Sequence, residues 1–217
     1  MAEFTIYIGN KNYSSWSLRG WLMAKAAGIA FDEVLIPLWQ ERSRAELLRH
    51  SPSGKVPALR HGAVTVWESL AIGEYLAEIR PEARLWPEAR EARAAARAVS
   101  HEMHAGFLAL RRALPMNLRA SVPGRPVTDE VRADLDRIAA LWRDCRRRFG
   151  AGGRFLFGGF TIADAMYAPV VSRLRTYRIV LDDEAQAYAD AIWAHPALAE
   201  WAAAARAETM VVAQFEF

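Results

Sequence analysis

Apolar residues in the first part of the chain follow two different periods. Residues 4–8 (Phe-Thr-Ile-Tyr-Ile) alternate in the two-residue period of a strand. From Leu18 to Ala26 the apolar positions recur at helical spacing, and Gly28 is a typical helix stop. A second strand is predicted at 31–36, where Pro37 ends it. These segments predict two strands connected by a helix.

The next segments complete a small unit of mixed secondary structure. A short helix is expected at 44–50, an antiparallel hairpin at 58–67, and a further helix at 68–79. Two parallel strands joined by a crossover helix and followed by a hairpin form the thioredoxin-like arrangement. We therefore predict a thioredoxin-like α+β domain over residues 1–80.

The pattern changes at residues 81–88, where two prolines interrupt any helix and predict a linker. Beyond the linker, apolar residues recur at helical spacing in segments rich in alanine, leucine and arginine. The second domain, residues 89–217, is therefore predicted to be all-α. Its helices are expected at 89–114, 129–149, 162–178, 183–194 and 197–208.

One helix start in the second domain resembles a catalytic pair but is assigned to folding. Thr161 and Asp164 have the spacing of a capping box, in which each side chain bonds the backbone N–H of the other. The apolar residues 155–160 before them suit a packed approach to the helix. Pro169 lies inside that helix and is expected to kink it.

Composition limits the possible function classes. The chain has 217 residues, a formal net charge of +3 and no apolar run long enough to span a bilayer, so we expect neither nucleic acid nor a membrane as a partner. Its start lacks the pattern of a signal peptide, and Cys145 is the single cysteine, so a cytoplasmic protein without an internal disulfide is expected. A zinc site built from several thiolates is excluded, and no metal is expected.

Residues 51–72 combine the features of a cleft that holds a peptide. The Val56-Pro57 bond is of the X-Pro type, the only kind that takes the cis form readily. A cis bond there would leave the N–H and C=O of Val56 pointing outward, where an extended peptide can pair with them. The helix that starts near Glu68-Ser69 presents free N–H groups that suit a carboxylate, and Glu68 suits an ammonium group. The predicted ligand is a small peptide with an amino-acid head.

This Val-Pro step, followed by an acid-serine pair before a helix, resembles the glutathione transferase superfamily. The resemblance implies that glutathione is the co-substrate and that the protein is a homodimer, with the first domain of one copy against the helical domain of the other. It also implies that Val56 holds the cysteinyl part of glutathione, that Glu68 and Ser69 hold its γ-glutamyl end, and that Lys55 holds its glycine carboxylate. The residues implied to bind glutathione are Gln40, Arg42, Lys55, Val56, Pro57, Glu68 and Ser69.

The chemistry of this superfamily requires a group that activates the glutathione thiol. A thiol with a pKa of about 8.5 is only a few per cent thiolate at neutral pH, and lowering that pKa by about two units takes roughly 2.7 kcal/mol. One hydrogen bond to a charged group contributes about 1.5–3 kcal/mol, and a helix N-terminus adds about 0.3–1 kcal/mol. A single hydroxyl at the start of the first helix is therefore sufficient.

Residues 14–19 place serines at that helix start. Their sequence, Ser-Ser-Trp-Ser-Leu-Arg, resembles the Ser-Ser-Cys-Ser-aromatic-Arg signature of the zeta class, with tryptophan in place of cysteine and leucine in place of the aromatic residue. The theta and tau classes of the superfamily also use serine. The match makes Ser14 the first candidate for the catalytic hydroxyl and Ser15 the second, with Tyr13 or Tyr7 third.

The second substrate is expected to lie against the helical domain. The candidate lining residues are Trp16, His104, Phe107 and Arg111. His101 and His104 lie three residues apart on the first long helix, but no third ligand at suitable spacing makes them a metal site.

The leading predicted function is a transferase of the detoxification type, in which the glutathione thiolate attacks a small hydrophobic electrophile. A glutathione-dependent isomerase or dehalogenase and a noncatalytic binding protein of the same fold are the alternatives. A thioredoxin-like oxidoreductase is rejected because no cysteine lies near the first helix.

Overall fold

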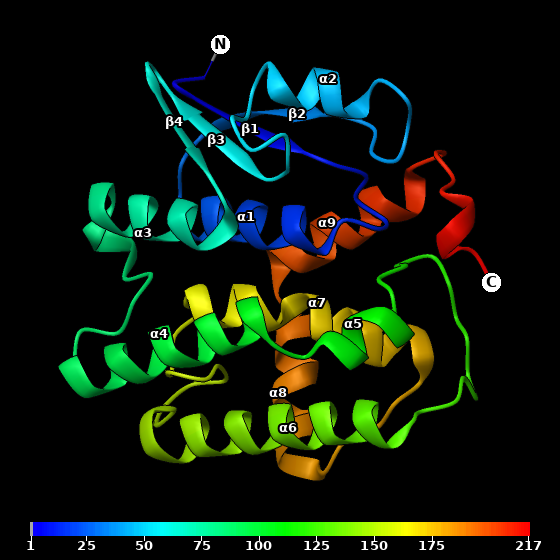
Figure 1. Ribbon diagram of the computed structural model, residues 1–217. Helices are drawn as coiled ribbons and strands as arrows, with labels where there is room; N and C mark the ends of the chain where they lie inside the picture. Colours follow the sequence, from blue (N-terminus) through cyan, green and yellow to red (C-terminus); the bar gives the residue numbers. More distant parts are fainter. Residues whose placement is uncertain (1) are drawn as a thin grey trace.

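The computed structural model describes residues 2–217 and shows a small mixed sheet above a group of helices (Figure 1). β1 (Phe4–Ile8) lies between β2 (Phe31–Leu35) and β3 (Ala58–His61), and β4 (Val64–Trp67) forms an edge next to β3. β1 and β2 are parallel, whereas the other two pairs are antiparallel. This is the thioredoxin-like arrangement that the sequence predicted.

Helices cover both faces of the sheet. α1 (Ser15–Ala26) and α3 (Ser69–Ile79) lie between the sheet and the helical domain, and α2 (Ser43–Leu48) lies on the opposite face (Figure 1). All five residues of β1 are buried, since side chains on both faces of this strand meet a helical layer. The layer formed by α1 and α3 places the start of each helix close to the helical domain.

The helical domain differs from the prediction in its first helix. The single helix expected at 89–114 is wrong: Gly106 is extended and Phe107 has a φ of 59°, so the segment divides into two helices. The helices are α4 (Arg90–Ala105), α5 (Leu108–Ala113), α6 (Asp129–Phe149), α7 (Ile162–Tyr177), α8 (Asp183–Trp193) and α9 (Pro196–Ala207), with 3-10 turns η1 (Pro81–Ala83) and η2 (Ala213–Phe215). The domain boundaries at residues 80 and 89 stay predictions.

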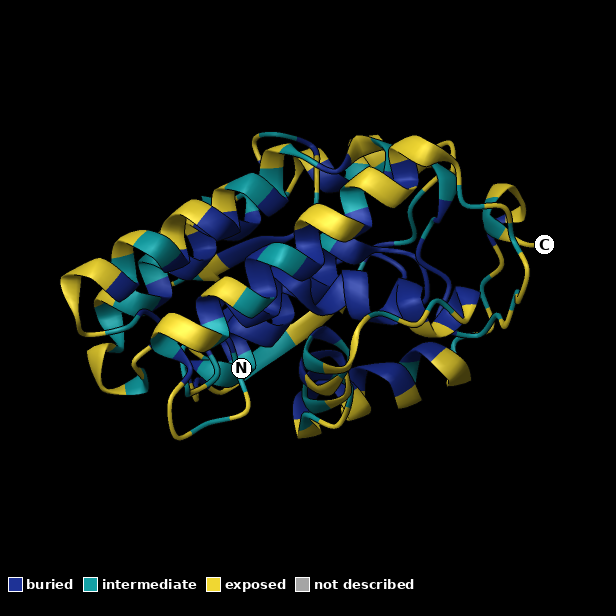
Figure 2. Ribbon diagram, turned by 90° about the horizontal axis from the view of Figure 1, so that it is seen from below, coloured by how far each residue is buried: buried dark blue, intermediate teal, exposed yellow. Residues whose placement is uncertain are grey.

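α7 is the central helix of the molecule. Every residue of α7 except Arg175 is buried, and the helix packs against α1, α4 and α8. Figure 2 shows the same organisation, with buried ribbon gathered in the interior and exposed residues on the outer helices. The capping box of Thr161 and Asp164 is present, as predicted, and the helix continues past Pro169, whose expected kink stays a prediction.

No helix within residues 2–217 is both long enough and apolar enough to cross a membrane.

Candidate active site

The hydroxyl of Ser14 lies at the N-terminus of α1. Ser14 is the N-cap residue, and its Oγ accepts a hydrogen bond from Ser17 N at 3.3 Å and donates one to Ser17 Oγ at 2.8 Å. Ser17 Oγ also accepts a bond from Gly9 N at 2.9 Å, which ties the segment after β1 to α1. These bonds hold the Ser14 hydroxyl where the helix N-terminus contributes positive partial charge.

A cavity of about 550 Å³ opens beside this helix start, between the two domains. Of the residues predicted from the sequence, its lining includes Ser14, Ser15, Trp16, Gln40, Lys55, Val56 and Arg111. The helical domain adds Pro115, Met116, Arg173 and Phe215. Polar groups of the first domain therefore face a largely apolar wall that also carries two arginines.

The loop before β3 forms one side of the cavity. The Val56-Pro57 bond is cis, as predicted, and Val56 lines the cavity. Pro57 does not line it and packs instead against α1, where a Cβ added at Gly20 would lie 2.8 Å from Pro57 Cγ. A residue without a side chain is therefore needed at position 20 for the loop to approach α1 so closely.

Glu68 and Ser69 lie at the start of α3, on the border with the helical domain. Glu68 has a φ of 80°, and its Oε2 accepts hydrogen bonds from the N–H groups of Leu70 at 3.0 Å and Ala71 at 3.4 Å. Ser69 Oγ donates to Glu68 Oε1 at 2.9 Å, and His104 Nδ1 of α4 lies 3.2 Å from the same oxygen. The carboxylate thus caps α3 while facing the other domain.

Glu68, Ser69 and His104 lie outside the cavity lining but are joined to it by Trp16. The ring of Trp16, which lines the cavity, meets the ring of His104 edge to face at a centroid distance of 5.0 Å. Phe107, also predicted to line the pocket, is buried at the start of α5. Arg42 is exposed ahead of α2, and Arg44 lines the cavity in its place.

Arginines surround Trp16 and the adjoining wall of the cavity. The guanidinium groups of Arg19 and Arg111 lie 4.4 Å and 5.0 Å from the Trp16 ring centroid. Arg173 is buried in α7 and donates to the carbonyls of Leu114 at 2.7 Å and Pro169 at 2.8 Å. Burial, together with the neighbouring Arg111, lowers the pKa of Arg173 to about 10. This wall is therefore electropositive and suits an anionic group.

The tyrosine alternatives to Ser14 are engaged elsewhere. The Tyr13 hydroxyl donates to Glu216 and accepts from Arg119 Nη2 at 2.6 Å and from Val212 N at 3.3 Å, so it holds the C-terminal segment in place. Tyr7 is buried in β1 and stacks on His50. Tyr13 lines the cavity as the two serines do, but its hydroxyl is occupied by these three bonds, so Ser14 and Ser15 remain the candidates for the activating hydroxyl.

Several cavity residues were missed by sequence reasoning, among them Arg173 and Phe215. The sequence signal for Arg173 was that a charged residue follows the apolar run 165–171 within one predicted helix. Phe215 offered no such signal: it reaches the cavity because the chain returns to the first domain, where its ring meets that of Trp39 at 4.9 Å. Within residues 2–217 no group of three or more histidines, cysteines or acids is placed to hold a metal ion.

The fold and cavity define a class of two-domain proteins, in which a cavity lies between a thioredoxin-like domain and a helical domain. Two family models, for the glutathione S-transferase N-terminal domain and C-terminal domain, match residues 13–79 and 92–204. The chain belongs to the glutathione S-transferase family.

Curated relatives carry an isomerase name. A maleylacetoacetate isomerase of Rattus norvegicus is 34% identical over 109 residues, which are 49% of this chain and 50% of the relative. A probable maleylacetoacetate isomerase of Caenorhabditis elegans is 26% identical over 171 residues, 77% of each chain. The match thus spans about half the length of the rat protein.

Solved structures support the fold. A glutathione transferase homologue from Burkholderia GL BGR1, with bound glutathione, has a TM-score of 0.71 at 22% identity and covers 94% of this chain and 99% of its own. A theta-class glutathione S-transferase from Xanthomonas axonopodis pv. citri, also with glutathione bound, has a TM-score of 0.67 at 23% identity and covers 93% of this chain and 98% of its own.

Proposed function

We propose that this protein is a glutathione transferase that lowers the pKa of the glutathione thiol and directs the thiolate to a small electrophile. The observation that carries the proposal is the position of Ser14 and Val56 in the walls of one cavity. A peptide held at Val56 as an added strand brings its cysteinyl sulfur toward the hydroxyl at the start of α1. Relatives of this fold with bound glutathione support the choice of peptide.

Ser14 activates the thiol in this proposal without acting as a base. The thiol proton is released to solvent, and the Ser14 hydroxyl, which donates to Ser17 Oγ in the free protein, turns to donate a hydrogen bond to the thiolate. The Ser17 hydroxyl then donates to Ser14 Oγ, so the lost bond is replaced. The new bond and the helix N-terminus together account for about two units of thiol pKa.

The two ends of glutathione are assigned to opposite sides of this serine. Lys55 and Gln40 line the cavity and offer a cation and an amide to the glycine carboxylate. Glu68 and Ser69 lie beyond Trp16, where they take the γ-glutamyl ammonium and carboxylate groups. We place this chemistry in the cytosol, where a reduced thiol such as that of Cys145 persists.

Calorimetric titration of glutathione, followed by ultraviolet absorbance of the bound thiolate against pH, tests the proposal. Wild-type protein should bind glutathione and lower its thiol pKa by about two units. Ser14→Ala should bind the peptide without this shift, and Ser15→Ala is the matched control. A shift lost only in Ser15→Ala would move the role to Ser15, and a protein that binds no glutathione would be a noncatalytic member of the family.

A glutathione-dependent isomerase is the second candidate function. The curated relatives carry the name maleylacetoacetate isomerase, and maleylacetoacetate is an anion by its chemistry. Arg111 and Arg173 supply positive charge to the cavity wall opposite the glutathione side. A carboxylate on the second substrate would pair with this wall in either reaction.

Product analysis separates the two functions. Nuclear magnetic resonance of a cis-configured, carboxylate-bearing alkene incubated with protein and glutathione should show a stable thioether adduct for conjugation. Appearance of the trans alkene with glutathione unchanged would identify the isomerase. Arg173→Leu, compared with Arg175→Leu on the exposed side of the same helix, should raise KM for an anionic substrate and leave a neutral electrophile unaffected.

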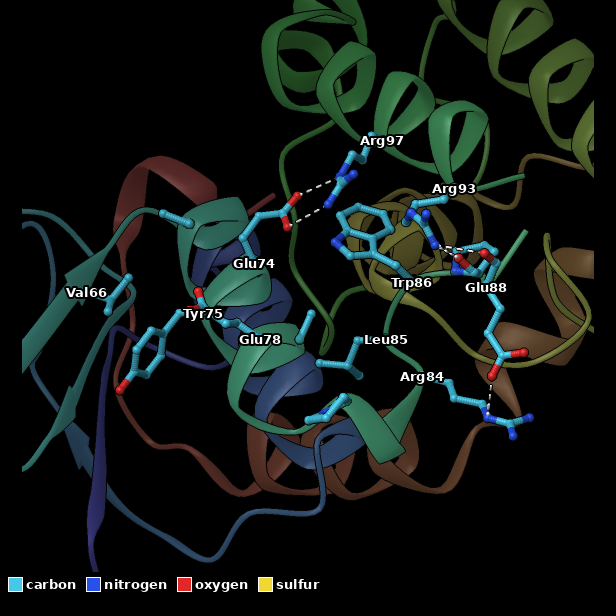
Figure 3. A pocket seen from close by; sticks show the side chains of 14 residues that line it. Val66, Glu74, Tyr75, Glu78, Arg84, Leu85, Trp86, Glu88, Arg93 and Arg97 are labelled. Carbon is cyan, nitrogen blue, oxygen red and sulfur yellow. Dashed lines mark hydrogen bonds and ion pairs between the residues drawn. The ribbon is translucent and has the colours of Figure 1, made fainter. Parts of the chain in front are cut away.

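We also infer that the groove between α3 and α4 is where two copies pair. Figure 3 shows this groove, with Glu74 of α3 and Arg97 of α4 joined across it and Trp86 beside them. The ion pair is two-pronged, at 3.0 and 3.2 Å, and links α3 of the first domain to α4 of the helical domain. The groove encloses about 860 Å³, so a segment of a second copy fits into it.

Sedimentation of the purified protein tests the pairing. Ala71 is exposed on α3 and lines the groove. Ala71→Arg puts a large charged side chain there, which should convert a dimer to a monomer. Ala187→Arg, on the exposed face of α8, is the matched control and should sediment as the wild type does. A wild-type monomer, or a dimer retained in Ala71→Arg, would overturn this assignment.

A further inference from the structure

His104 of the helical domain faces the acid that begins α3 in the other domain. The side chain belongs to the last turn of α4 and is a third exposed (33%), and its Nδ1 lies 3.2 Å from Glu68 Oε1. The contact joins the two domains at the place assigned to the γ-glutamyl end of glutathione. Sequence reasoning placed His104 in the second-substrate pocket, whereas the structure places it against Glu68.

The negative charge of Glu68 indicates which nitrogen of His104 carries the proton. Nδ1 is buried and has no hydrogen bond of good alignment within residues 2–217. An unprotonated Nδ1 would place its lone pair within 3.2 Å of a negatively charged oxygen of Glu68, which is repulsive, so we assign the proton of the neutral ring to Nδ1. Nε2 is then the basic atom, and a second proton there makes an imidazolium beside the carboxylate.

Glu68 has little freedom to turn away from this histidine. Its Oε2 accepts the N–H groups of Leu70 and Ala71, and its Oε1 accepts the Ser69 hydroxyl. A φ of 80° in a residue other than glycine persists only where surrounding bonds enforce it. The side of Oε1 that accepts no hydrogen bond faces His104. A cationic group of a ligand that binds Glu68 there therefore competes with the histidine for this oxygen.

The charges around His104 oppose one another. Burial lowers the pKa of His104 most, the neighbouring Glu68 raises it, and Arg19, Arg111 and His101 lower it further. Arg111 approaches from α5, where its Nη2 donates to the His104 carbonyl at 3.2 Å, and Arg19 approaches from α1. His101 lies one turn earlier on α4 and donates through Nδ1 to the Arg97 carbonyl at 2.9 Å. The neutral ring is thus favoured near pH 7.

We propose that His104 is a positioning residue that controls access of the γ-glutamyl ammonium to Glu68. The neutral ring holds the carboxylate in place for the ligand, and the protonated ring pairs with the carboxylate and excludes the ammonium. The inference rests on the proposed function, because it takes Glu68 as the γ-glutamyl site. Glutathione affinity then falls as the pH falls, independently of the thiol.

S-methylglutathione is the suitable probe, because its sulfur does not titrate. Because the pKa of His104 lies below its ordinary value, calorimetric titration should show affinity falling about three- to tenfold from about pH 8 to about pH 5. His104→Asn keeps an N–H donor for Glu68 but takes up no proton, so its affinity should stay near the wild-type value at pH 8 across this range. His101→Asn, the matched control on the same helix, should retain the pH dependence.

A second ligand tests the inference on the wild-type protein alone. An S-methylglutathione analogue without the γ-glutamyl amino group has no ammonium to compete with His104, so its weaker binding should not change with pH in this range. Equal pH dependence in wild type and His104→Asn, or for both ligands, would overturn the inference while leaving the proposed function intact. Absence of S-methylglutathione binding at every pH would instead overturn the proposed function.

Discussion

The starts of α3 and α7 contain the same chemical groups and use them differently. Each start combines an acid with a hydroxyl: Glu68 with Ser69, and Asp164 with Thr161. Both acids accept backbone N–H groups that the first turn of a helix leaves unpaired. The two starts differ in whether the carboxylate can still accept a further hydrogen bond after it has capped the helix.

At the start of α7 both oxygens of the Asp164 carboxylate accept hydrogen bonds from other residues of the protein. Asp164 is fully buried, and its oxygens accept bonds from Leu156 N at 3.1 Å, Thr161 N at 2.8 Å, Thr161 Oγ1 at 2.9 Å and Tyr188 Oη at 3.0 Å. Burial raises the pKa of Asp164 to about 6, although these hydrogen bonds act in the opposite direction. No direction remains open to a ligand.

At α3 the carboxylate keeps a direction free of capping bonds. The Glu68 side chain is 40% exposed, and one side of its Oε1 faces His104 of the other domain. An acid that caps a helix and has all its acceptor positions filled by other residues of the protein contributes to stability alone. An acid that caps a helix at a cleft and is only partly saturated is available to a ligand, and the following substitutions test this distinction.

The largest expected effect on stability is that of Asp164→Ala. The change leaves the N–H groups of Leu156 and Thr161 and the Tyr188 hydroxyl buried without their acceptor. Unpaired buried donors are each expensive, so the free energy of unfolding should fall by about 3–5 kcal/mol. Urea denaturation measures it, with Glu68→Ala as the matched variant, for which a loss of about 1 kcal/mol is expected. Equal losses in the two variants would remove the distinction.

The pH dependence of stability should come next in size. Since the folded-state pKa of Asp164 is raised to about 6 from the ordinary value of 3.8, the native state holds a proton that the unfolded chain releases. The contribution of Asp164 to the free energy of unfolding is fully present below its ordinary pKa and is lost as the pH rises through about 6. The total loss is up to about 3 kcal/mol. Urea midpoints of wild type and Asp164→Asn between about pH 4 and 7 measure this, and parallel curves would contradict it.

Glu68→Gln should affect ligand affinity more than stability, in contrast to the Asp164 variants. The amide keeps one oxygen for capping α3, so stability should change by less than about 1 kcal/mol. Loss of the negative charge removes the partner of the ligand ammonium, so affinity for S-methylglutathione should fall about tenfold or more, equivalent to about 1.4 kcal/mol. Asp164→Asn is the comparison: its folded fraction should bind the peptide with nearly unchanged affinity. Calorimetry on both variants decides between the two roles.

Local patterns in the sequence predicted the parts of the site that lie on one segment. Ser14 at a helix start, the cis bond before Pro57 and the capping box at Asp164 are set by neighbouring residues, and each was found. The division of the helix at Phe107 was missed, although Gly106 is a signal for a helix end.

Features that depend on distant contacts were not predicted. The facing of His104 and Glu68 requires the angle between two domains, which no local period encodes. The same holds for Phe215, which reaches the cavity through bonds between residues about two hundred positions apart, such as Tyr13 to Glu216. Arg173 lies on a helix buried on nearly all sides, so no apolar stripe indicated which way the side chain points.

The smallest effect, and the finest test of saturation at Asp164, is expected for Tyr188→Phe. The ring stays in place while one donor to Asp164 Oδ1 is removed, which should reduce stability by about 1 kcal/mol near pH 7. Because that donor favours the ionised carboxylate, its removal should raise the pKa of Asp164 further, and the stability loss should shrink below about pH 5, where the group is protonated. Urea titrations at the two pH values measure both effects. A loss that is the same at each pH would show that the hydroxyl contributes through packing alone, and that the carboxylate is less dependent on its donors than the geometry indicates.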